Sequence, residues 1–421
     1  MSLEYVYGKR NKQEIKRKHK LYIVYKIYRL LMDLFTQYDD KKFVTFPKIN
    51  DVNELNSLYN KLNFYVPVSK QSQIQILVSQ DLINTDFEKD ISLSSQRNYI
   101  KNNNIKLVTH IEKKDQVLLH KIKAFRELSF LQYFKVHLID DDFYSTSESI
   151  TLQNFAYLMS EKKYLQELNQ ISIENFQKMV AKNRDKKNSY CFVTGPSFDK
   201  YKEFDYEKNS FKVICNSTVK NHQFLECIGA PNLLVFADPV FHFSPSEYAA
   251  TFRDEALSVV LKYKCYVMVP QKAMPLIIEN YPLLKEYLIG MPVKQKPFNF
   301  KINFPTQENF FVNGTANILT LFMIPVASSF SEEVNIIGAD GREKNENYFW
   351  KHSSSAQFDD LMQTVFTTHP SFFRDRDYED YYEQHCNYLE KLFAYGENKK
   401  IKYFSLTDSF IPALKTRRKS R

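Results

Sequence analysis

Four short apolar runs between residues 190 and 340 constrain this chain most, because each is followed directly by a polar residue that can hold a ligand. Those residues are Thr194, Asn216, Asp238 and Asp340. Short β-rich runs that are bounded by turn residues and separated by helical stretches are typical of a parallel α/β sheet. In such a sheet a ligand binds beyond the carboxyl ends of the strands. The pattern therefore predicts that the four side chains converge on one crevice, although each of them alone is also an ordinary loop cap.

Length and composition point to a folded protein of several domains. The chain has 421 residues, of which 43% are hydrophobic. This is enough for two or three domains with proper cores, and it excludes a disordered protein. Its five cysteines show no metal-ligand spacing and are expected to be buried thiols of a reducing compartment. Because the sequence has neither a run of about 18 apolar residues nor a signal-peptide pattern, we expect a cytoplasmic protein.

The net charge of +9 is concentrated at the two ends of the chain. Basic residues crowd 9–20, an apolar and aromatic helical stretch follows at 21–31, and a second basic run occupies 415–421. A basic segment beside an amphipathic helix is typical of binding to anionic lipid, so we expect peripheral association with the inner membrane face, with solvated tails as the alternative. Basic tails also attract nucleic acid. We expect no nucleic-acid partner, because the many aromatic residues accompany abundant Lys and Asn, as an AT-rich genome produces.

The chain divides into two α/β regions joined by helices. We expect a basic amphipathic segment at 1–40, an accessory α/β domain at 41–150, a helical connector at 151–187, a catalytic domain at 188–412 and a basic tail at 413–421. In the first domain the expected strands are 43–46, 73–78, 105–109 and 134–139, and the expected helices lie near 52–63 and 115–131. In the second, the expected strands are 190–193, 211–215, 233–237, 265–269, 334–337 and 401–405, with a buried helix at 315–323.

Two turns have the composition of an anion-binding site. Gly195-Pro196-Ser197 follows a strand and offers a tight turn, free backbone N–H groups and a hydroxyl. Gly314-Thr315 opens the expected buried helix, whose positive end favours an anion. Neither turn matches a dinucleotide fingerprint or a Walker loop. Together with the amide and carboxylate groups on neighbouring strands, the turns indicate a nucleotide-binding site.

These motifs resemble those of bacterial sialyltransferases of glycosyltransferase family 42. The similarity lies in the strand and Gly-Pro-Ser turn at 190–197, the Cys-Asn ending at 215–216, the Phe-Ala-Asp-Pro ending at 236–239, the Asn-Gly-Thr-Ala-Asn helix start at 313–317 and the Ile-Gly-Ala-Asp strand end at 337–340. It covers about 188–412 and leaves the preceding residues without a counterpart. Together with the strand spacing, it implies an α/β fold in which a Rossmann-like parallel-sheet nucleotide-binding domain is preceded by a second, smaller α/β domain. It also implies an enzyme that uses CMP-sialic acid and acts on lipooligosaccharide.

The resemblance assigns roles to particular residues. Substrate contacts fall to Thr194, Gly195, Pro196, Ser197, Asn216, Asp238, Gly314, Thr315, Ala316 and Asp340. Tyr348 matches a tyrosine that steadies the leaving phosphate, and Arg342 stands where the family has a second tyrosine. The chain also departs from the family at Thr194 and Asp238, where Asn is usual, and at Thr315-Ala316, where Ser-Gly is usual. A guanidinium is a strong phosphate donor, so Arg342 can replace the phenol, although the change could also reflect a different sugar.

Breaking the bond between an anomeric carbon and a phosphate builds charge on the phosphate, which a metal or fixed donors must stabilise. Under the resemblance Tyr348 and Arg342 are those donors, so we expect no metal and no other cofactor. The expected general base is His369, in the loop before the last helix, with His352 as the second candidate. The prediction is an inverting glycosyltransferase that moves a sialic acid or related keto-sugar acid from a CMP-activated donor to a cell-surface glycan or its lipid-linked precursor.

Two alternatives remain open. Asp375-Arg376-Asp377 has the Asp-x-Asp pattern with which many sugar-nucleotide transferases hold a divalent metal, although acidic residues at this place also cap the first turn of a helix. Metal binding there would indicate a metal-dependent transferase that uses another nucleotide sugar. A protein of a different class would be a non-catalytic, membrane-associated nucleotide or glycan binder.

Overall fold

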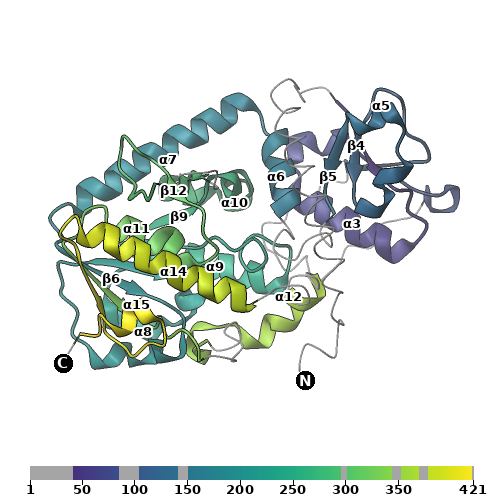
Figure 1. Cartoon of the computed structure of the whole chain (residues 1–421). Helices are drawn as coiled ribbons and strands as arrows, with labels where there is room; N and C mark the ends of the chain where they lie inside the picture. The colour runs from purple at the N-terminus through teal and green to yellow at the C-terminus, as the bar shows by residue number, and fades with distance from the viewer. Residues whose placement is uncertain are drawn as a thin grey trace.

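A computed structural model describes residues 41–84, 104–140, 150–294, 301–343, 352–368 and 378–419. Figure 1 shows two α/β regions side by side, a smaller one from the N-terminal part of the described chain and a larger one from the rest. Helices α6 (Ile150–Met159) and α7 (Lys162–Asn183) connect them. The segment expected at 1–40 lies outside the described residues. Among the helices that are described, none is both long and apolar enough to cross a membrane.

The smaller region is built on a sheet of five parallel strands in the order β3-β2-β1-β4-β5. Their bounds are β1 (Phe43–Phe46), β2 (Ile74–Leu77), β3 (Lys106–Val108), β4 (Gln116–Leu119) and β5 (Val136–Leu138). The strands are added outwards from β1 on both sides, as in a doubly wound sheet. Four of the five strands agree with the sequence-based prediction.

Strand β4 occupies a region that was predicted to be helical. Residues 115–131 form β4, a 3₁₀ turn at Ile122–Glu127 and the short helix α5 (Phe130–Tyr133) instead of one helix. Val117, Leu118 and Leu119 are fully buried, and a short apolar run of this kind cannot be distinguished from a buried helical segment by its periodicity. Pairing with β1 on one side and β5 on the other decides the conformation. The helix prediction was wrong here.

Helix α3 (Val52–Tyr65) agrees with the helix predicted near 52–63. It begins where the side chain of Asp51 accepts a hydrogen bond from the Glu54 N–H at 2.8 Å, which satisfies one of the free donors of the first turn. Leu55, Leu58 and Leu62 are buried and recur at the three- and four-residue spacing of an amphipathic helix. The packing of α3 against α6 is therefore specified by the sequence itself.

The two regions are held together by specific contacts as well as by apolar packing. The Val68 N–H, just after α3, donates to the carboxylate of Glu279 in α10 (Met274–Asn280) at 2.8 Å. The Arg253 guanidinium of α9 (Glu247–Tyr263) lies 5.4 Å from the centre of the Phe64 ring. One hydrophobic cluster includes buried residues of both regions. The regions therefore share part of their core.

The larger region is built on a sheet of seven parallel strands in the order β10-β9-β8-β7-β6-β13-β14. Their bounds are β6 (Asn188–Phe192), β7 (Phe211–Cys215), β8 (Leu233–Val235), β9 (Tyr266–Pro270), β10 (Leu288–Met291), β13 (Glu333–Ile337) and β14 (Lys402–Ser405). The chain steps outwards from β6 to β10 and then returns to the other side of β6 with β13. The direction of strand addition reverses between β6 and β13, which is the topological switch point of the sheet. The predicted α/β, Rossmann-like parallel fold is confirmed.

Strand β10 was missed by the sequence analysis because Gly290 lies in the middle of it. Glycine in a strand interior weakens the sequence pattern and often marks a close approach of another segment. Here a Cβ at position 290 would lie 2.0 Å from Sδ of Met274, so α10 packs directly against the strand. The two short strands β11 (Val293–Lys294) and β12 (Val312–Asn313), which pair with each other outside the main sheet, were not predicted either.

All five cysteines are free thiols. Cys191 in β6, Cys215 in β7 and Cys265 just before β9 are buried, as predicted. Cys227 is exposed and Cys386 is half-buried, so the prediction of burial was wrong for Cys227.

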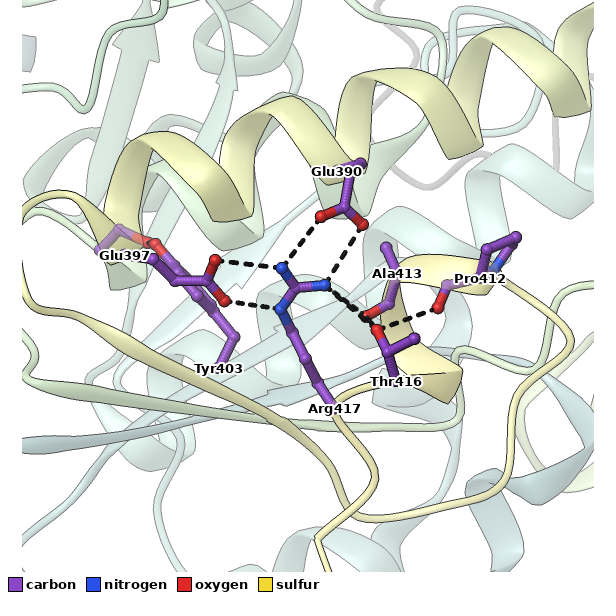
Figure 2. A network of polar contacts seen from close by, with 8 residues as sticks. Glu390, Glu397, Tyr403, Pro412, Ala413, Thr416 and Arg417 are labelled. Carbon is purple, nitrogen blue, oxygen red and sulfur yellow. Dashed lines mark hydrogen bonds and ion pairs between the residues drawn. The ribbon is translucent and has the colours of Figure 1, made fainter.

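The residues that follow β14 pack against this edge strand instead of forming a free tail. Residues 416–419 run alongside it and exchange backbone hydrogen bonds with it. The Arg417 guanidinium lies between the carboxylates of Glu390 and Glu397, both on α14 (Tyr378–Glu397), at 2.9 and 2.6 Å (Figure 2). Lys419 forms an ion pair of 2.6 Å with the first residue of β13. Much of the basic charge that suggested a membrane-binding or solvated tail is therefore paired within the fold.

Candidate functional site

The loops that follow β6 and β13 meet at the switch point. The Gly195 N–H donates to the Gly338 carbonyl at 2.9 Å, and the Ser197 N–H donates to both carboxylate oxygens of Asp340 at 3.1 Å. We call Thr194, Gly195, Ser197, Gly338 and Asp340 the switch-point cluster. Ligands of doubly wound sheets bind at this place, beyond the carboxyl ends of the strands.

Gly195 allows the two loops to approach this closely. A Cβ at this position would lie 2.3 Å from the Oδ2 atom of Asp340 and 2.5 Å from the Gly338 carbonyl oxygen. Its φ of −66° is one that any residue adopts, so the requirement for glycine is steric rather than conformational. Gly338 has a φ of +76°, where L side chains are strained, and its Cβ would clash with the Val193 carbonyl. Both glycines are therefore needed for the geometry of the switch-point cluster.

The backbone N–H groups of the 195–197 turn are engaged within the protein. Gly195 donates to Gly338, Ser197 donates to Asp340, and Pro196 has no N–H. The sequence analysis expected these groups to be free to bind a phosphate, and that expectation does not hold in this structure. The turn fixes the carboxylate of Asp340 instead.

Asp340 is half-buried and is held by contacts to its side chain and its backbone. Burial raises the pKa of the Asp340 carboxyl above its ordinary value, while the hydrogen bonding from Ser197 and the charge of Lys200 oppose the rise. The Phe410 N–H donates to the Asp340 carbonyl at 2.7 Å. A fixed carboxyl group with a perturbed pKa at the ends of the strands is typical of a functional site.

His352, the second candidate for a general base, lies against the switch-point cluster. Its Nδ1 atom is 3.0 Å from the Thr194 hydroxyl oxygen. The next residue, Ser353, donates its N–H to the Thr194 carbonyl at 2.9 Å and its hydroxyl to Asp199 at 2.8 Å. His352 is half-buried. The structure therefore places an imidazole at the carboxyl end of β6.

Asn216 directly follows β7 in a left-handed conformation with a φ of +49°, which asparagine tolerates better than most residues. Its Oδ1 atom is buried and has no hydrogen-bond partner among the described residues. The neighbouring Ser217 hydroxyl is bonded to the Ala356 carbonyl at 2.5 Å, so the 352–357 segment also covers the end of β7. A buried amide oxygen without a partner is uncommon in native proteins, and a ligand or an ordered water would satisfy it.

Asp238, at the end of β8, caps its own loop. Its Oδ1 atom accepts hydrogen bonds from the N–H groups of Val240 at 2.8 Å and Phe241 at 3.1 Å. Its N–H is bonded to Nδ1 of His242 at 3.1 Å. Burial, with the nearby charge of Arg253, lowers the pKa of His242 to about 3, so this ring is neutral and accepts. The geometry of Asp238 is that of a loop cap.

The Gly314–Ala316 turn lies further from a helix end than the sequence suggested. Gly314 donates its N–H to the Lys294 carbonyl at 2.9 Å, and the helical turns begin only at Leu319. The Asn317 side chain caps them by accepting from the Leu319 N–H at 2.9 Å. The expected helix at 315–323 is a π-helical turn at Leu319–Met323 followed by α11 (Ile324–Ala327). The buried segment is confirmed, but its helical start is four residues later and is already capped.

Two adjacent tyrosines of α14 contact residues that the sequence analysis singled out. The Tyr381 hydroxyl donates to the Ala316 carbonyl at 2.8 Å. The Tyr382 hydroxyl accepts from the Arg342 N–H and donates to the Arg342 carbonyl, both at 3.3 Å, and the guanidinium carbon lies 4.9 Å from the Tyr382 ring centre. Burial raises the pKa of Tyr382 to about 12, so the hydroxyl keeps its proton. Sequence reasoning missed both tyrosines, because many other tyrosines in this chain give no functional signal.

Several predicted site residues lie outside the described residues. They are Tyr348, His369, Asp375 and Asp377. Among the described residues there is no group of three or more His, Cys, Asp or Glu side chains that could hold a metal ion. The described part of the candidate site therefore consists of the switch-point cluster with His352, the loop residues after β7 and β8, and the Ala316 and Arg342 loops joined by α14.

Comparisons with known proteins add little to this geometry. No protein-family model matches the chain, and no curated protein matches it. Among solved structures, the chain is similar to a monofunctional α-2,3-sialyltransferase, Cst-I from Campylobacter jejuni. The identity is 12% and the TM-score is 0.32, over 53% of this chain and 77% of that one. At this level the likeness carries no argument about function, which therefore has to be argued from the residues themselves.

Proposed function

We propose that this protein is an inverting, metal-independent glycosyltransferase that moves a sialic acid or related keto-sugar acid from a CMP-activated donor to a cell-surface glycan or its lipid-linked precursor. The observation that carries the proposal is the meeting of the 194–197 and 338–340 loops at the switch point, with Asp340 fixed between them. These two loops also carry two of the sequence motifs that resemble the sialyltransferase family. Sequence motif and strand topology thus point to the same place in the fold.

The nucleotide would bind across the carboxyl ends of β6 and β7. The buried amide oxygen of Asn216 would receive a hydrogen bond from the donor, which removes the cost of leaving it without a partner. Asp340 would accept from a donor hydroxyl or amino group with the carboxylate lone pairs that the Ser197 N–H does not use. In this proposal Asp238 holds the loop after β8 in place and does not bind the donor through Oδ1, because that atom already accepts from the N–H groups of Val240 and Phe241.

Arg342 and Tyr348 would stabilise the leaving phosphate. When the acceptor oxygen attacks the anomeric carbon, the bond from that carbon to the phosphate oxygen breaks and its electron pair stays on the phosphate of CMP. A guanidinium fixed beside this oxygen is a charge-assisted donor and needs no metal. Tyr382 would position Arg342, because its hydroxyl holds both backbone polar groups of that residue and its ring lies against the guanidinium.

The acceptor proton would pass to His369. His352 is the second candidate, supported by its position beside Thr194. The two histidines can be separated by substitution, since only the base is needed for turnover and neither is required to hold the nucleotide.

A membrane surface would present the acceptor, and the smaller region has a surface suited to it. Phe130 and Leu131 on α5 are 73% and 63% exposed, and Phe134 is exposed beside them. This apolar tip is flanked in sequence by Lys121, Lys123, Arg126 and Lys135 against a single acidic residue, Glu127. Figure 1 places α5 on the side of the smaller region that faces away from the larger one. Exposed aromatic residues among cations are suited to an anionic lipid surface.

Calorimetric titration with CMP in the presence of EDTA, alongside UDP with manganese, tests the proposal. We expect CMP to bind without metal and more tightly than UDP. UDP binding that requires manganese would replace the proposal with the metal-dependent transferase and direct attention to Asp375 and Asp377. Failure of both nucleotides to bind would overturn it.

Turnover distinguishes an enzyme from a binding protein. We expect His369→Ala to abolish transfer from a CMP-sugar donor while CMP still binds, and His352→Ala to retain transfer. The reverse result would assign the base to His352. Absence of transfer in the wild-type protein, with CMP binding intact across a panel of CMP-sugar donors and glycan acceptors, would favour the non-catalytic binder.

A further inference from the structure

A cavity of about 550 Å³ lies at the amino-terminal end of the larger sheet, opposite the switch-point cluster. Its walls come from segments that lead into β6, β7, β8 and β9, and from the last residues of α7, α8 (His222–Ile228) and α9. The volume is within the range of about 300–1,000 Å³ that is usual for small-molecule sites. None of the residues assigned to the candidate site lines it.

The charged groups that line the cavity are nearly all cationic. They are Lys182, Lys186, Lys208, Lys212 and Lys264, with the single carboxylate Glu226. None of these lysines forms an ion pair with a residue that the structure describes. Lys182, Lys208 and Lys264 are exposed, whereas Lys186 is half-buried and Lys212 is buried. Like charges around one space disfavour one another, and an anion that enters relieves this.

Two of the lysines show the effect of burial on their charge, and at Lys186 the repulsion from neighbouring lysines adds to it. Burial, followed by the charges of Lys212 and Lys182, lowers the pKa of Lys186 to about 8. Lys212 is only 6% exposed, and burial lowers its pKa as well. Surface lysines in water keep their ordinary pKa, so these two are held in an environment that disfavours their charge.

The ends of neighbouring helices account for only some of the lysines that line the cavity. Three helices finish beside the cavity, and their carbonyl ends favour cations. Lys212 uses this directly, because its ammonium donates to the Ile228 carbonyl at the end of α8 at 2.5 Å. Within the described part of the chain, the ammonium groups of Lys182, Lys186, Lys208 and Lys264 donate no hydrogen bond of this kind. A direct cap therefore explains Lys212, and the carbonyl ends of α7 and α9 favour Lys182 and Lys264, which leaves Lys186 and Lys208.

We propose that this cavity is a binding site for a phosphate-bearing small molecule with at least two negative charges. Ammonium groups are point-charge donors to phosphate oxygens, and several of them around one space suit a diphosphate better than a single carboxylate. Tyr206, Tyr263 and Tyr266 also line the cavity and offer ring surface to the organic part of such a ligand. The phosphate could belong to a free metabolite or to a lipid headgroup. The site is independent of the proposed transferase activity, because it lies at the opposite end of the strands.

Inorganic pyrophosphate is the first probe, titrated calorimetrically into the full chain. We expect saturable binding with one site per chain, and Lys186→Met should weaken it by about tenfold, the effect of one charge-assisted contact. Lys262→Met is the matched control, since this lysine lies on α9 close to the cavity but does not line it. Arg342→Ala tests whether pyrophosphate binds beside the proposed transfer site instead of in the cavity.

Vesicles of phosphatidylcholine that contain a phosphoinositide distinguish the two sources of phosphate. Binding of both pyrophosphate and vesicles, each reduced by Lys186→Met, would identify a lipid headgroup, and binding of pyrophosphate alone would identify a soluble ligand. Loss of pyrophosphate binding in Arg342→Ala with retention in Lys186→Met would assign the anion to the switch point and overturn the proposal. Absence of binding by both probes would overturn it as well.

Chemical modification gives a measurement that needs no substitution. With a pKa of about 8, the Lys186 amine reacts with acetic anhydride near that pH faster than an ordinary lysine. Pyrophosphate should protect Lys186 from acetylation, as measured by mass spectrometry, and leave Lys262 unprotected. Equal acetylation of Lys186 with and without saturating pyrophosphate would contradict the proposed site.

Discussion

The N–H group of Ser197 donates to both carboxylate oxygens of Asp340, each at 3.1 Å, and so joins the loop after β6 to the loop after β13. The two residues follow strands that are neighbours in the sheet but far apart in the sequence. This carboxylate and the hydrogen bond from the Gly195 N–H to the Gly338 carbonyl together set the distance between the two loops at the switch point. Any ligand that binds there meets a geometry fixed before it arrives.

Replacing Asp340 with Ala should lower the free energy of unfolding by about 1–3 kcal/mol, because the Ser197 N–H loses its acceptor in a half-buried place. Asp340→Asn is the matched control, since it keeps one acceptor oxygen, and it should stay within about 1 kcal/mol of the wild type at neutral pH. The pKa of Asp340 in the folded state is raised above the ordinary value of 3.8, so the protonated carboxyl stabilises the fold at low pH. This contribution to the free energy of unfolding is complete below pH 3.8 and is lost as the pH rises through the folded-state pKa. Asn does not ionise, so the free energy of unfolding of Asp340→Asn should increase relative to that of the wild type as the pH rises through this range. Urea unfolding at several pH values measures it, and a pH-independent difference would contradict the assignment.

Gly195→Ala should destabilise the protein by about 1–3 kcal/mol through overpacking, because the new methyl group meets the Asp340 carboxylate and the Gly338 carbonyl. Thermal unfolding followed by circular dichroism measures the effect. A double variant, Gly195→Ala with Asp340→Ala, should lose less than the two single variants added together, because one of the clashing groups is gone. Simple additivity would indicate that the two loops are not in contact in solution.

Arg342→Ala should reduce kcat by about 10²–10³ in a CMP-sugar transfer assay, as removal of one fixed donor to a developing charge does in other enzymes. Arg342→Lys should recover part of the rate, because the charge remains while the planar, multiple donors are lost. Steady-state kinetics with a saturating acceptor separates kcat from KM. If Arg342→Ala raises KM and leaves kcat unchanged, the arginine binds the ground state and has no special role in the departure of the phosphate.

Arg417→Met should lower the stability by about 1–2 kcal/mol, because two charge-assisted contacts to α14 disappear while the apolar stem remains. The Arg417 side chain is only 15% exposed, so salt screens this network less than an ordinary surface pair. Lys415→Met, at an exposed position of the preceding short helix, is the control and should change the stability by less than about 0.5 kcal/mol. Equal urea midpoints for the two variants would mean that the network contributes nothing.

Replacing Phe130 and Leu131 with Ser should weaken the binding of the protein to anionic vesicles by at least about tenfold, since burial of either side chain in lipid contributes about 1.5–3 kcal/mol. Leu283→Ser changes an equally exposed leucine of the larger region and should have no effect. Co-sedimentation with vesicles of graded anionic lipid content measures both. Similar losses in the two variants would indicate adsorption without a defined contact surface.

The strand pattern of the larger sheet was predictable because its parallel strands are buried on both faces and read as apolar runs with a polar residue at each end. The loops that begin at Thr194 and end at Asp340 could be predicted to meet for that reason, and Gly195 and Ser197 do lie against Asp340. Strands β4 and β10 escaped prediction, the first because its short apolar run has no distinctive period and the second because Gly290 interrupts it.

The hydrogen-bond partners at the site could not be predicted, because they come from residues distant in the sequence. The Ser197 N–H was expected to bind a phosphate, but it donates to Asp340. The start of the helical turns after Gly314 was also expected to bind an anion, but the Asn317 side chain caps it. Arg417 is a further example. A basic run at the end of a chain predicts a solvated tail, but in the fold this arginine is paired with Glu390 and Glu397 of α14. Sequence patterns identify which residues are special but not which of them satisfy one another.

The order of strands in the larger sheet has a consequence for biosynthesis. β6 pairs with β7 on one side and with β13 on the other, and residues 193–332 build everything between them. While the ribosome is still translating this stretch, β6 exposes an apolar edge with unpaired backbone groups, which is a template for association with other chains. The pairing that closes this edge is the same one that brings Ser197 to Asp340. The nascent chain therefore acquires its candidate site and its protection from association with other chains in one late step.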